Sequence, residues 1–418
     1  MNAPLANLAI DPKRLWGSLM MTAGIGGTPK GGIRRLTLTD EDRRVRDWFR
    51  AQVEALGCTV TVDEVGNMFA LRPGRRSDLL PIAMGSHLDT QPTGGKFDGV
   101  LGVLAGLEAL RTLADLEVET NAPILLVNWT NEEGARFAPA MLGSGVYAGL
   151  FDRAFADSRE DRTGQKFGEA LEAIGYRGQA KAGSVPIGAL FELHIEQGPI
   201  LEAEGLEIGI VEGVQAIRWY DVKVTGREQH SGSTPMGIRK DALLAAAQLI
   251  QAVDAAARRQ PGGVGTVGLI ESAPNSRNVI PGEVFFSIDF RHPEAAAIDA
   301  MEADMRAAVE KVAAERGVEI AFDLLWSSPR VEFDVDCIAC VAEAAAKNGF
   351  SARRMLSGPG HDAAYVAKVA PASMIFVPCK DGISHNEAEE TSPDQCAAGA
   401  QVLLDAVLAY DRRFAEAG

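Results

Sequence analysis

The sequence has few cysteines, no long apolar run and no excess of positive charge, and each shortage excludes a class of protein. Its 418 residues include five cysteines, an odd and sparse set that does not make a disulfide scaffold, so we expect a reducing, cytoplasmic setting. No stretch approaches the ~18 consecutive apolar residues that a membrane helix requires. The net charge of −16 argues against a nucleic-acid partner and against an anionic membrane surface, because both attract basic faces.

Two further signals are missing from the sequence. The first residues, MNAPLANLAIDPKRLW, lack a basic region followed by a long apolar run and a small-residue cleavage site, so we expect no secretion. The single CxxC pair, Cys337 and Cys340, has no second pair to complete a zinc site. Because that pair lies in an Ala-rich helical stretch, a packing role is favoured over a metal-binding one.

The composition is that of a globular protein, with 46% hydrophobic and 23% charged residues. A chain of 418 residues is long for one core, so two domains are expected. Strand-like and helix-like segments alternate in the first half. The apolar run Ile124–Trp129 is typical of a strand buried on both faces, and an apolar helix is expected after Asp98. This alternation predicts an α/β fold with a layered mixed sheet.

Between residues 214 and 326 the pattern changes to a compact two-layer unit. The order of expected elements there is βαββαβ. Its strands and helices are expected at Arg218–Thr225, Lys240–Arg258, Val264–Ile270, Glu283–Arg291, Pro293–Arg316 and Val318–Leu325. We therefore predict a domain of residues 214–326 inserted into a domain formed by residues 1–213 and 327–418.

The stretch PIAMGSHLDTQPTGGKFD, residues 81–98, places His87 at the end of a short apolar strand. A Pro/Gly loop follows, and Asp98 precedes the next helix. A histidine and a carboxylate held by one strand end and its loop can converge on a single metal ion. Asp89 lies on the side of His87 where it could orient the imidazole ring.

Other histidines and acids follow strand-like runs in the same way. Five of the six histidines lie in Gly/Pro/Asp/Glu-rich segments outside helical periodicity. His194 stands near the end of the run FELHIEQGP, and His385 stands in SHNE after the apolar run Ser373–Val377. In open α/β sheets the carboxyl ends of the strands form the edge where sites assemble.

These residues predict a site for two divalent metal ions. Asp98 could bridge the ions, and a plausible division gives two histidines to one ion and an acid with a histidine to the other, although spacing alone does not determine the pairing. Imidazole and carboxylate ligands without thiolate suit Zn, with Mn, Co or Ni as alternatives. The expected ligands are His87 and His194 for one ion and Glu133 and His385 for the other, with Asp98 shared.

The adjacent pair Glu132 and Glu133 follows the Ile124 strand in the segment TNEEGARF. Neighbouring side chains of an extended segment diverge, so the two cannot bind one metal in the same way. One can be a ligand while the other faces the substrate as a general base. In isolation the pair would be a solvated acidic turn, but the buried strand before it favours the catalytic interpretation.

Seven motifs, in order along nearly the whole chain, together resemble a known family. They are GSHLDT…FDG, NEEGARF, ELHIEQGP, QHSGSTPM, RNVIPG…DFR, SGPGHDA and SHNE. The sequence is similar to the dinuclear-metal amidohydrolases of the hydantoinase/carbamoylase family, which comprise L-N-carbamoylases, β-ureidopropionases and allantoate amidohydrolases. Metallo-aminoacylases and peptidases are related to them and look less similar to this chain.

The resemblance implies a role for each matching residue. It makes Glu132 the catalytic base and Asp89 the residue that orients His87, and it agrees with the metal ligands above. The remaining roles are oxyanion stabilisation by His230, a substrate-carboxylate clamp of Asn278 and Arg291, and a substrate pocket lined by Gln197, Gly360 and His361. Simpler interpretations exist for three of these: an exposed strand-end Arg291, a loop His230 that bonds backbone, and a His361 that caps the next helix.

The activity implied is metal-dependent hydrolysis of the ureido C–N bond of an N-carbamoyl amino acid, such as N-carbamoyl-β-alanine or an N-carbamoyl-L-amino acid. Allantoate hydrolysis, and aminoacylase or dipeptidase activity, are the alternatives, and a non-catalytic homologue is disfavoured by the complete ligand set. The resemblance also implies a homodimer, with residues 214–326 as lid and dimerisation domain, in which His230 is supplied either by the same chain or by the partner subunit. Because ligands and clamp fall in different domains, we expect closure about a hinge near Val214 and Trp326.

Overall fold

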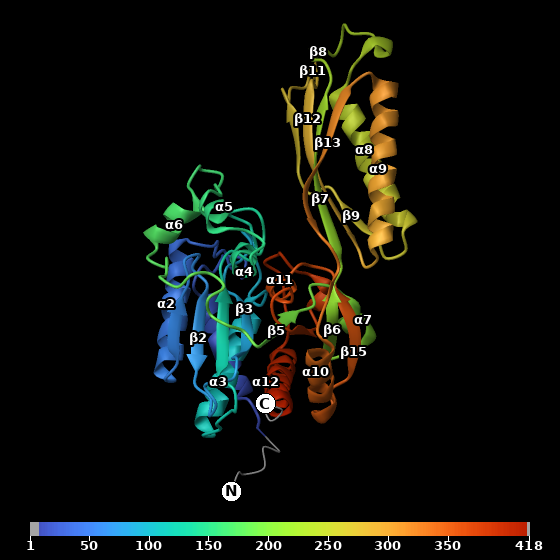
Figure 1. The fold of residues 1–418 in the computed structure, drawn as a ribbon. Helices are drawn as coiled ribbons and strands as arrows, with labels where there is room; N and C mark the ends of the chain where they lie inside the picture. The colour runs from blue at the N-terminus through green and yellow to red at the C-terminus, as the bar shows by residue number, and fades with distance from the viewer. Residues whose placement is uncertain (1–7, 416–418) are drawn as a thin grey trace. The chain divides into compact units, whose positions relative to one another are not determined.

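The computed structural model describes residues 8–415 and divides into two compact units (Figure 1). Unit 1 consists of Met1–Gly213 and Glu332–Gly418, and unit 2 of Val214–Val331. The sequence alone places the second boundary at residues 326/327, which falls inside the strand β13 (Glu319–Ser328). That strand remains whole in unit 2, because its pairing with β7 continues to Ser328.

Unit 1 contains a nine-stranded mixed sheet, as the sequence predicts. Strand β3 runs parallel to β4 and β5, and β16 runs parallel to β5, whereas β2 and β6 are antiparallel to their neighbours β4 and β16. Along the sheet the order is β1 (Thr59–Val62), β2 (Met68–Arg72), β4 (Ile124–Trp129), β3 (Ile82–His87), β5 (Ala189–Ile195), β16 (Ala372–Val377), β6 (Ile208–Val214) and β14 (Val331–Glu332), with β15 (Ala352–Ser357) paired to β6.

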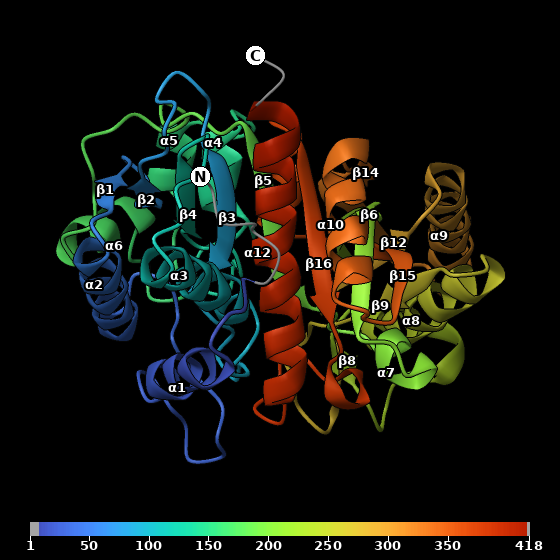
Figure 2. The same cartoon turned by 90° about the horizontal axis from the view of Figure 1, so that it is seen from below.

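The central strands β3, β4, β5 and β16 are buried along their whole length, which explains their continuous apolar runs. Helix α3 (Val100–Asp115) packs on β3, and α12 (Pro393–Ala415) packs beside it against β5 and β16. Figure 2 shows α12 between α3 and α10 (Val335–Lys347). A Cβ at Gly102 would lie 2.3 Å from the Leu193 carbonyl oxygen, so α3 approaches the sheet closely only because glycine stands there.

The other helices of unit 1 connect and cover the sheet. The N-terminus of α2 is capped by Thr39, whose hydroxyl accepts a hydrogen bond from the backbone N–H of Asp42. These helices are α1 (Pro12–Ala23), α2 (Asp40–Ala55), α4 (Leu142–Tyr147), α5 (Arg153–Asp157), α6 (Phe167–Ala173), α7 (Ile200–Glu204) and α11 (Asp362–Val366), with the 3₁₀ turn η2 (Lys380–Gly382).

Unit 2 has a separate five-stranded antiparallel sheet and a short two-stranded ribbon. The sheet order is β10 (Ile270–Ala273), β12 (Glu283–His292), β7 (Ala216–Thr225) and β13, with β9 (Val264–Thr266) also on β12; the ribbon pairs β8 (Gln229–His230) with β11 (Val279–Ile280). The prediction of one strand over Val264–Ile270 is wrong. The chain instead pairs with β12 in two places, and between them the Leu269 carbonyl accepts a hydrogen bond from Ser287 N.

The core of unit 2 lies between one face of this sheet and two helices. Residues of β12 alternate between buried and partly exposed positions, as expected of an antiparallel strand with one covered face. Helices α8 (Ala242–Arg259) and α9 (Ala295–Arg316) lie side by side along the sheet (Figure 1), and η1 (Met236–Ile238) is a short exposed turn. Buried aromatic side chains, including Tyr220 and Phe286, fill the core.

All five cysteines are free and buried, and Cys337 and Cys340 face the interior from α10, as the packing role predicts. Within residues 8–415, none of the helices combines the length and the apolar character that crossing a bilayer demands.

Candidate metal centre and active site

The predicted ligands of unit 1 come from one edge of its sheet. His87 ends β3, His194 is the penultimate residue of β5, and Glu132 and Glu133 follow the end of β4. The loop that carries His385 follows β16. Because these four strands are mutually parallel where they pair, their carboxyl ends meet at the same edge.

The first cluster consists of His87, Asp98 and His194, whose ligand atoms lie within 4.8 Å of one another. Asp98 Oδ1 is 3.1 Å from His194 Nε2 and 3.8 Å from His87 Nε2. The Nδ1 atoms face backbone carbonyls instead, at 2.9 Å from Asp89 O for His87 and 2.9 Å from Ile195 O for His194. A proton on each Nδ1 leaves both Nε2 lone pairs directed to the centre, which is the tautomer a metal ligand needs.

The second cluster consists of Asp98, Glu133 and His385. His385 Nε2 is 3.4 Å from Asp98 Oδ2 and 3.4 Å from Glu133 Oε2. Asp98 therefore presents one carboxylate oxygen to each cluster, which is the arrangement of a bridging ligand. The structure thus brings all five predicted ligands together and separates them in the predicted way.

The charges in these clusters call for a cation. Burial raises the pKa of Glu133 to about 8, and the Asp98 carboxylate adds to the effect. Burial lowers the pKa of His87 to about 4. For buried His194 and half-exposed His385 desolvation favours the neutral ring, but hydrogen bonding to Asp98 outweighs it and raises the pKa of each to about 9. Carboxylates and imidazoles gathered within a few ångströms of one another are a set of donors that fits divalent ions.

The backbone after Asp98 packs closely against the imidazole rings, so the rings have little room to move. Gly99, which precedes α3, has φ 67°, and a Cβ there would lie 2.3 Å from His87 Nε2. Its backbone N–H donates to His194 Nε2 over 3.1 Å. Only glycine allows the turn after Asp98 to pass directly beneath both rings.

Glu132 and Glu133 diverge as expected. Glu132 Oε2 lies 3.4 Å from His87 Nε2, whereas Glu133 faces His385. The turn is held by Asn131, which has φ 60° and donates its side-chain N–H to the Phe137 carbonyl over 2.7 Å. Glu132 is buried, and burial together with the carboxylates of Asp362 and Glu133 raises its pKa well above the usual range.

Asp89 contacts His87 differently from the expectation. Its carboxylate is 4.0 Å from His87 Nδ1, and the closer contact is made by its backbone carbonyl. The two carboxylate oxygens instead accept hydrogen bonds from the backbone N–H groups of Glu132 and Glu133, each over 3.3 Å. Asp89 therefore connects the imidazole of one cluster to the loop that carries the two glutamates.

The predicted pocket residues of unit 1 lie against the clusters. Gln197 has φ 55° and donates from Nε2 to Asp98 Oδ2 over 2.9 Å. Its Oε1 is buried without a hydrogen-bond partner among the described residues. His361, which follows Gly360, packs against His194 with ring centroids 4.5 Å apart and ring planes tilted by 59°. His361 occupies the N-cap position of α11, where its backbone carbonyl accepts a hydrogen bond from Ala364 N, but its side chain makes no capping hydrogen bond.

The predicted residues of unit 2 have a different environment. His230 and Asn278 are exposed and adjacent, since β8 pairs with β11. His230 Nδ1 accepts from Gly232 N over 3.1 Å, so the proton is on Nε2. Arg291 is paired with Asp289 through Nε at 3.1 Å and Nη2 at 2.7 Å, and its side chain is 24% exposed, so it is only partly the exposed strand-end arginine of the simpler interpretation.

Two side chains that hold the ligands were not predicted from the sequence. Gln91 donates from its backbone N to Glu133 Oε1 over 3.0 Å and from Nε2 to Oε2 over 2.7 Å. Glu389 accepts from the backbone N–H of Asp98 over 3.1 Å. Gln91 stands two residues after Asp89 and Glu389 four after His385, so proximity to a motif was the available signal. Nothing in the sequence distinguishes Glu389 from Glu387 or Glu390.

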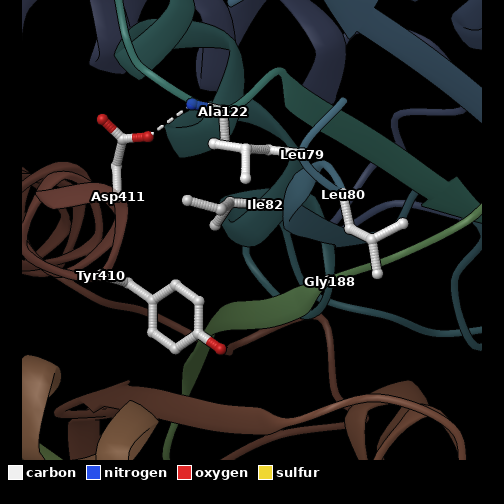
Figure 3. Close-up of a pocket in the computed structure, with 7 residues that line it drawn as sticks. All are labelled: Leu79, Leu80, Ile82, Ala122, Gly188, Tyr410 and Asp411. Carbon is white, nitrogen blue, oxygen red and sulfur yellow. Dashed lines mark hydrogen bonds between the residues drawn. The ribbon is translucent and has the colours of Figure 1, made fainter. Parts of the chain in front are cut away.

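A cavity at the amino ends of β3, β4 and β5 is not a second candidate for the active site (Figure 3). It has a volume of about 170 Å³ and is lined by Leu79, Leu80, Ile82, Ala122, Gly188, Tyr410 and Asp411. Asp411 is its acidic residue, and both carboxylate oxygens accept hydrogen bonds from the turn that starts β4, one from Ala122 N over 2.7 Å. This carboxylate therefore holds the turn before β4 against α12 and has a structural role.

Comparison with known proteins agrees with the geometry. The model of peptidase family M20/M25/M40 matches residues 83–409. An N-carbamoyl-L-amino-acid amidohydrolase of Rhizobium meliloti is 50% identical over 409 residues, 98% of each chain, and one of Geobacillus stearothermophilus is 38% identical over 95% of this chain and 98% of that protein. The crystal structure of a hydantoinase/carbamoylase family amidase from Burkholderia vietnamiensis has a TM-score of 0.92 and 51% identity, covering 97% of this chain and 98% of that one. The chain belongs to the M20 family and, within it, to the hydantoinase/carbamoylase amidases.

Proposed function

We propose that this protein hydrolyses N-carbamoyl-L-amino acids. One water is consumed for each ureido group, and the products are the amino acid, ammonia and carbon dioxide. The observation that carries this proposal is the pair of ligand clusters that share Asp98, with Glu132 beside them at 3.4 Å from His87. The relative with 50% identity bears this activity in its name, whereas an allantoate amidohydrolase of Bacillus subtilis is 35% identical.

The residues that would hold the two ions are His87 and His194 on one side, Glu133 and His385 on the other, and Asp98 between them. Imidazole and carboxylate donors favour Zn, with Mn, Co or Ni as alternatives. Bound divalent ions would polarise the ureido carbonyl and lower the pKa of a water molecule toward neutrality.

Glu132 is the proposed general base. Its carboxylate takes a proton from the attacking water and delivers it to the leaving nitrogen. Burial suits this shuttle, because a raised pKa lets the group hold the proton between the two transfers. Asp89 holds Glu132 and His87 in place relative to each other: its carboxylate accepts from the backbone N–H of Glu132, and its carbonyl contacts the ring of His87.

The remaining assignments concern the substrate. His230, protonated on Nε2, would donate a hydrogen bond to the developing oxyanion. Arg291 would bind the substrate carboxylate with Asn278, since a guanidinium pairs bidentately with a carboxylate. Gln197 offers its free Oε1 as an acceptor for a ureido N–H, beside His361 and Gly360. The homodimer and the closing movement of unit 2 stay predictions.

A substrate panel tests the proposal. Purified protein is loaded with Zn²⁺ or Mn²⁺ and given N-carbamoyl-L- and D-α-amino acids, N-carbamoyl-β-alanine, allantoate, N-acetyl-amino acids and dipeptides. Ammonia is measured for the ureido compounds and free amino acid for all. We expect the highest kcat/KM on an N-carbamoyl-L-amino acid. A higher value on N-acetyl compounds or dipeptides would overturn the assignment in favour of an aminoacylase or peptidase.

A further inference from the structure

The acidic run after His385 contains three glutamates that the structure treats differently. Glu387 pairs at the surface with Lys30 at 3.7 Å, and Glu390 is exposed and pairs with Lys380 at 2.8 Å. Glu389 is only 4% exposed and points inward. A buried carboxylate is costly unless hydrogen bonds compensate for the lost water, so its partners indicate what it is there to hold.

Glu389 connects the two segments that carry Asp98 and His385. Its Oε1 accepts hydrogen bonds from the backbone N–H of Phe97 over 3.0 Å and of Asp98 over 3.1 Å. Its Oε2 lies 2.9 Å from the hydroxyl of Ser384. That same hydroxyl lies 3.1 Å from Asp98 Oδ2, so Ser384 stands between the two carboxylates and next to His385 in the chain.

The Glu389 side chain packs directly against the backbone at Gly95, where there is no room for a Cβ atom. A Cβ at Gly95 would lie 2.1 Å from both Cδ and Oε1 of Glu389. Any larger residue at position 95 would therefore displace the carboxylate from the Asp98 loop. The close approach of Gly95 is a second observation, independent of the hydrogen bonds, that Glu389 has one required position.

The two clusters depend on this contact to different degrees. His87 and His194 are buried on strands β3 and β5 and are held by the sheet. His385 lies on a loop, has a side chain that is 51% exposed, and adopts φ 53°. A non-glycine residue keeps such a backbone conformation only where its surroundings impose it, and the hydrogen bond between Glu389 and Ser384, the residue before His385, is one constraint on this loop.

We propose that Glu389 is a positioning residue for the second ion. It holds the Asp98 loop and the His385 loop in one arrangement and so determines how tightly the Asp98–Glu133–His385 cluster binds its metal. The first cluster shares Asp98 but is affected less, because its two histidines are held by the sheet. The inference rests on the proposed two-metal site. Partners that orient metal ligands change affinity or activity by ~10–100-fold when they are removed.

Cobalt binding to the full-length protein tests this directly. The metal is removed with a chelator, and apoprotein is titrated with Co²⁺ while visible absorption and bound cobalt per chain are recorded. The wild type should bind two ions per chain. In Glu389→Gln the first ion should bind as in the wild type, and the second ~10–100-fold more weakly. Turnover lost in this variant should return at high Co²⁺ concentration.

Two further variants complete the design. Glu390→Gln removes a neighbouring exposed carboxylate and should leave both binding steps unchanged. Gly95→Ala adds one methyl group without altering charge and should weaken the second step as Glu389→Gln does, which covers the case that the latter does not fold. Two wild-type-like steps in Gly95→Ala and in any folded Glu389 variant would overturn the role of Glu389. Failure of the wild type to bind a second ion would overturn the proposed metal centre itself.

Discussion

The two units handle charged side chains in opposite ways. Unit 1 buries His87, Asp98 and Glu132 at a sheet edge, each less than a tenth exposed. Unit 2 fills its core with apolar and aromatic side chains and leaves His230 and Asn278 exposed. Burying charge is unfavourable without a compensating partner, so unit 1 is built to bind cations, whereas the polar residues of unit 2 are free to meet a ligand from outside.

Removing metal should distinguish the two units most strongly, because the bound cations would balance buried charges in unit 1 alone. Chelation should abolish turnover and lower the thermal midpoint, and ions that bind only the folded state can contribute ~4 kcal/mol at a thousandfold excess over Kd. Hydrogen exchange should increase in peptides from β3, β5 and the His385 loop. Peptides from α8 and β12 serve as the control. Equal loss of hydrogen-exchange protection in both units would contradict the prediction that metal stabilises unit 1 alone.

Glu132→Gln separates catalysis from metal binding within unit 1. The amide cannot take a proton from water, so kcat should fall by ~10²–10⁴. Metal content should remain at the wild-type value, because Glu133 and not Glu132 lies beside His385. Metal analysis and single-turnover rates measure the two effects. Near-normal turnover in this variant would remove Glu132 from the mechanism.

Phe286→Ala addresses the apolar core of unit 2. The side chain is fully buried between the sheet and the helices, and truncations of this kind cost ~3–5 kcal/mol. Chemical denaturation should show the loss, while metal bound per chain stays unchanged. Leu324→Ala, at a position that is 50% exposed, is the matched control and should cost much less. Metal loss in Phe286→Ala would mean that the two units are not independent in this respect.

Arg291→Ala tests whether a partly exposed arginine of unit 2 binds substrate. Loss of a bidentate charge-assisted contact should raise KM by ~10–100-fold and change kcat less. Arg258→Ala, which removes an exposed arginine paired with Asp254 at 2.8 Å, is the control. An N-carbamoyl amine without a carboxylate should not distinguish wild type from Arg291→Ala. An unchanged KM for the carboxylate substrate would refute the clamp.

Much of this architecture follows from local patterns. The apolar run that became β4 is long enough to predict burial on both faces, and a histidine or acid after this run and after those of β3 and β16 indicated a shared edge. The inserted unit was recognisable from its change of pattern. The split of Val264–Ile270 into two strands was not, because it depends on how β12 pairs across the sheet.

The contacts around the predicted metal ligands were harder to predict from the sequence. Asp89 was expected to orient His87, but the sequence did not indicate that its backbone carbonyl makes the close contact while its carboxylate holds the glutamate loop. Gln91 and Glu389 carry no periodic signal, since each acts through a residue far away in the chain. Hydrogen-bond direction and distance become defined only after the loops are in place.

By itself, the sequence determined the residue types available at each strand end, the alternation of helix and strand, and the absence of thiolate from the predicted metal ligands. Those properties are local, because periodicity and side-chain chemistry act over a few residues. Tertiary structure alone decided that Asp98 turns one oxygen toward each cluster and that one of three similar glutamates is buried behind it. Both outcomes depend on segments about 290 residues apart meeting at one edge, where packing selects a single arrangement.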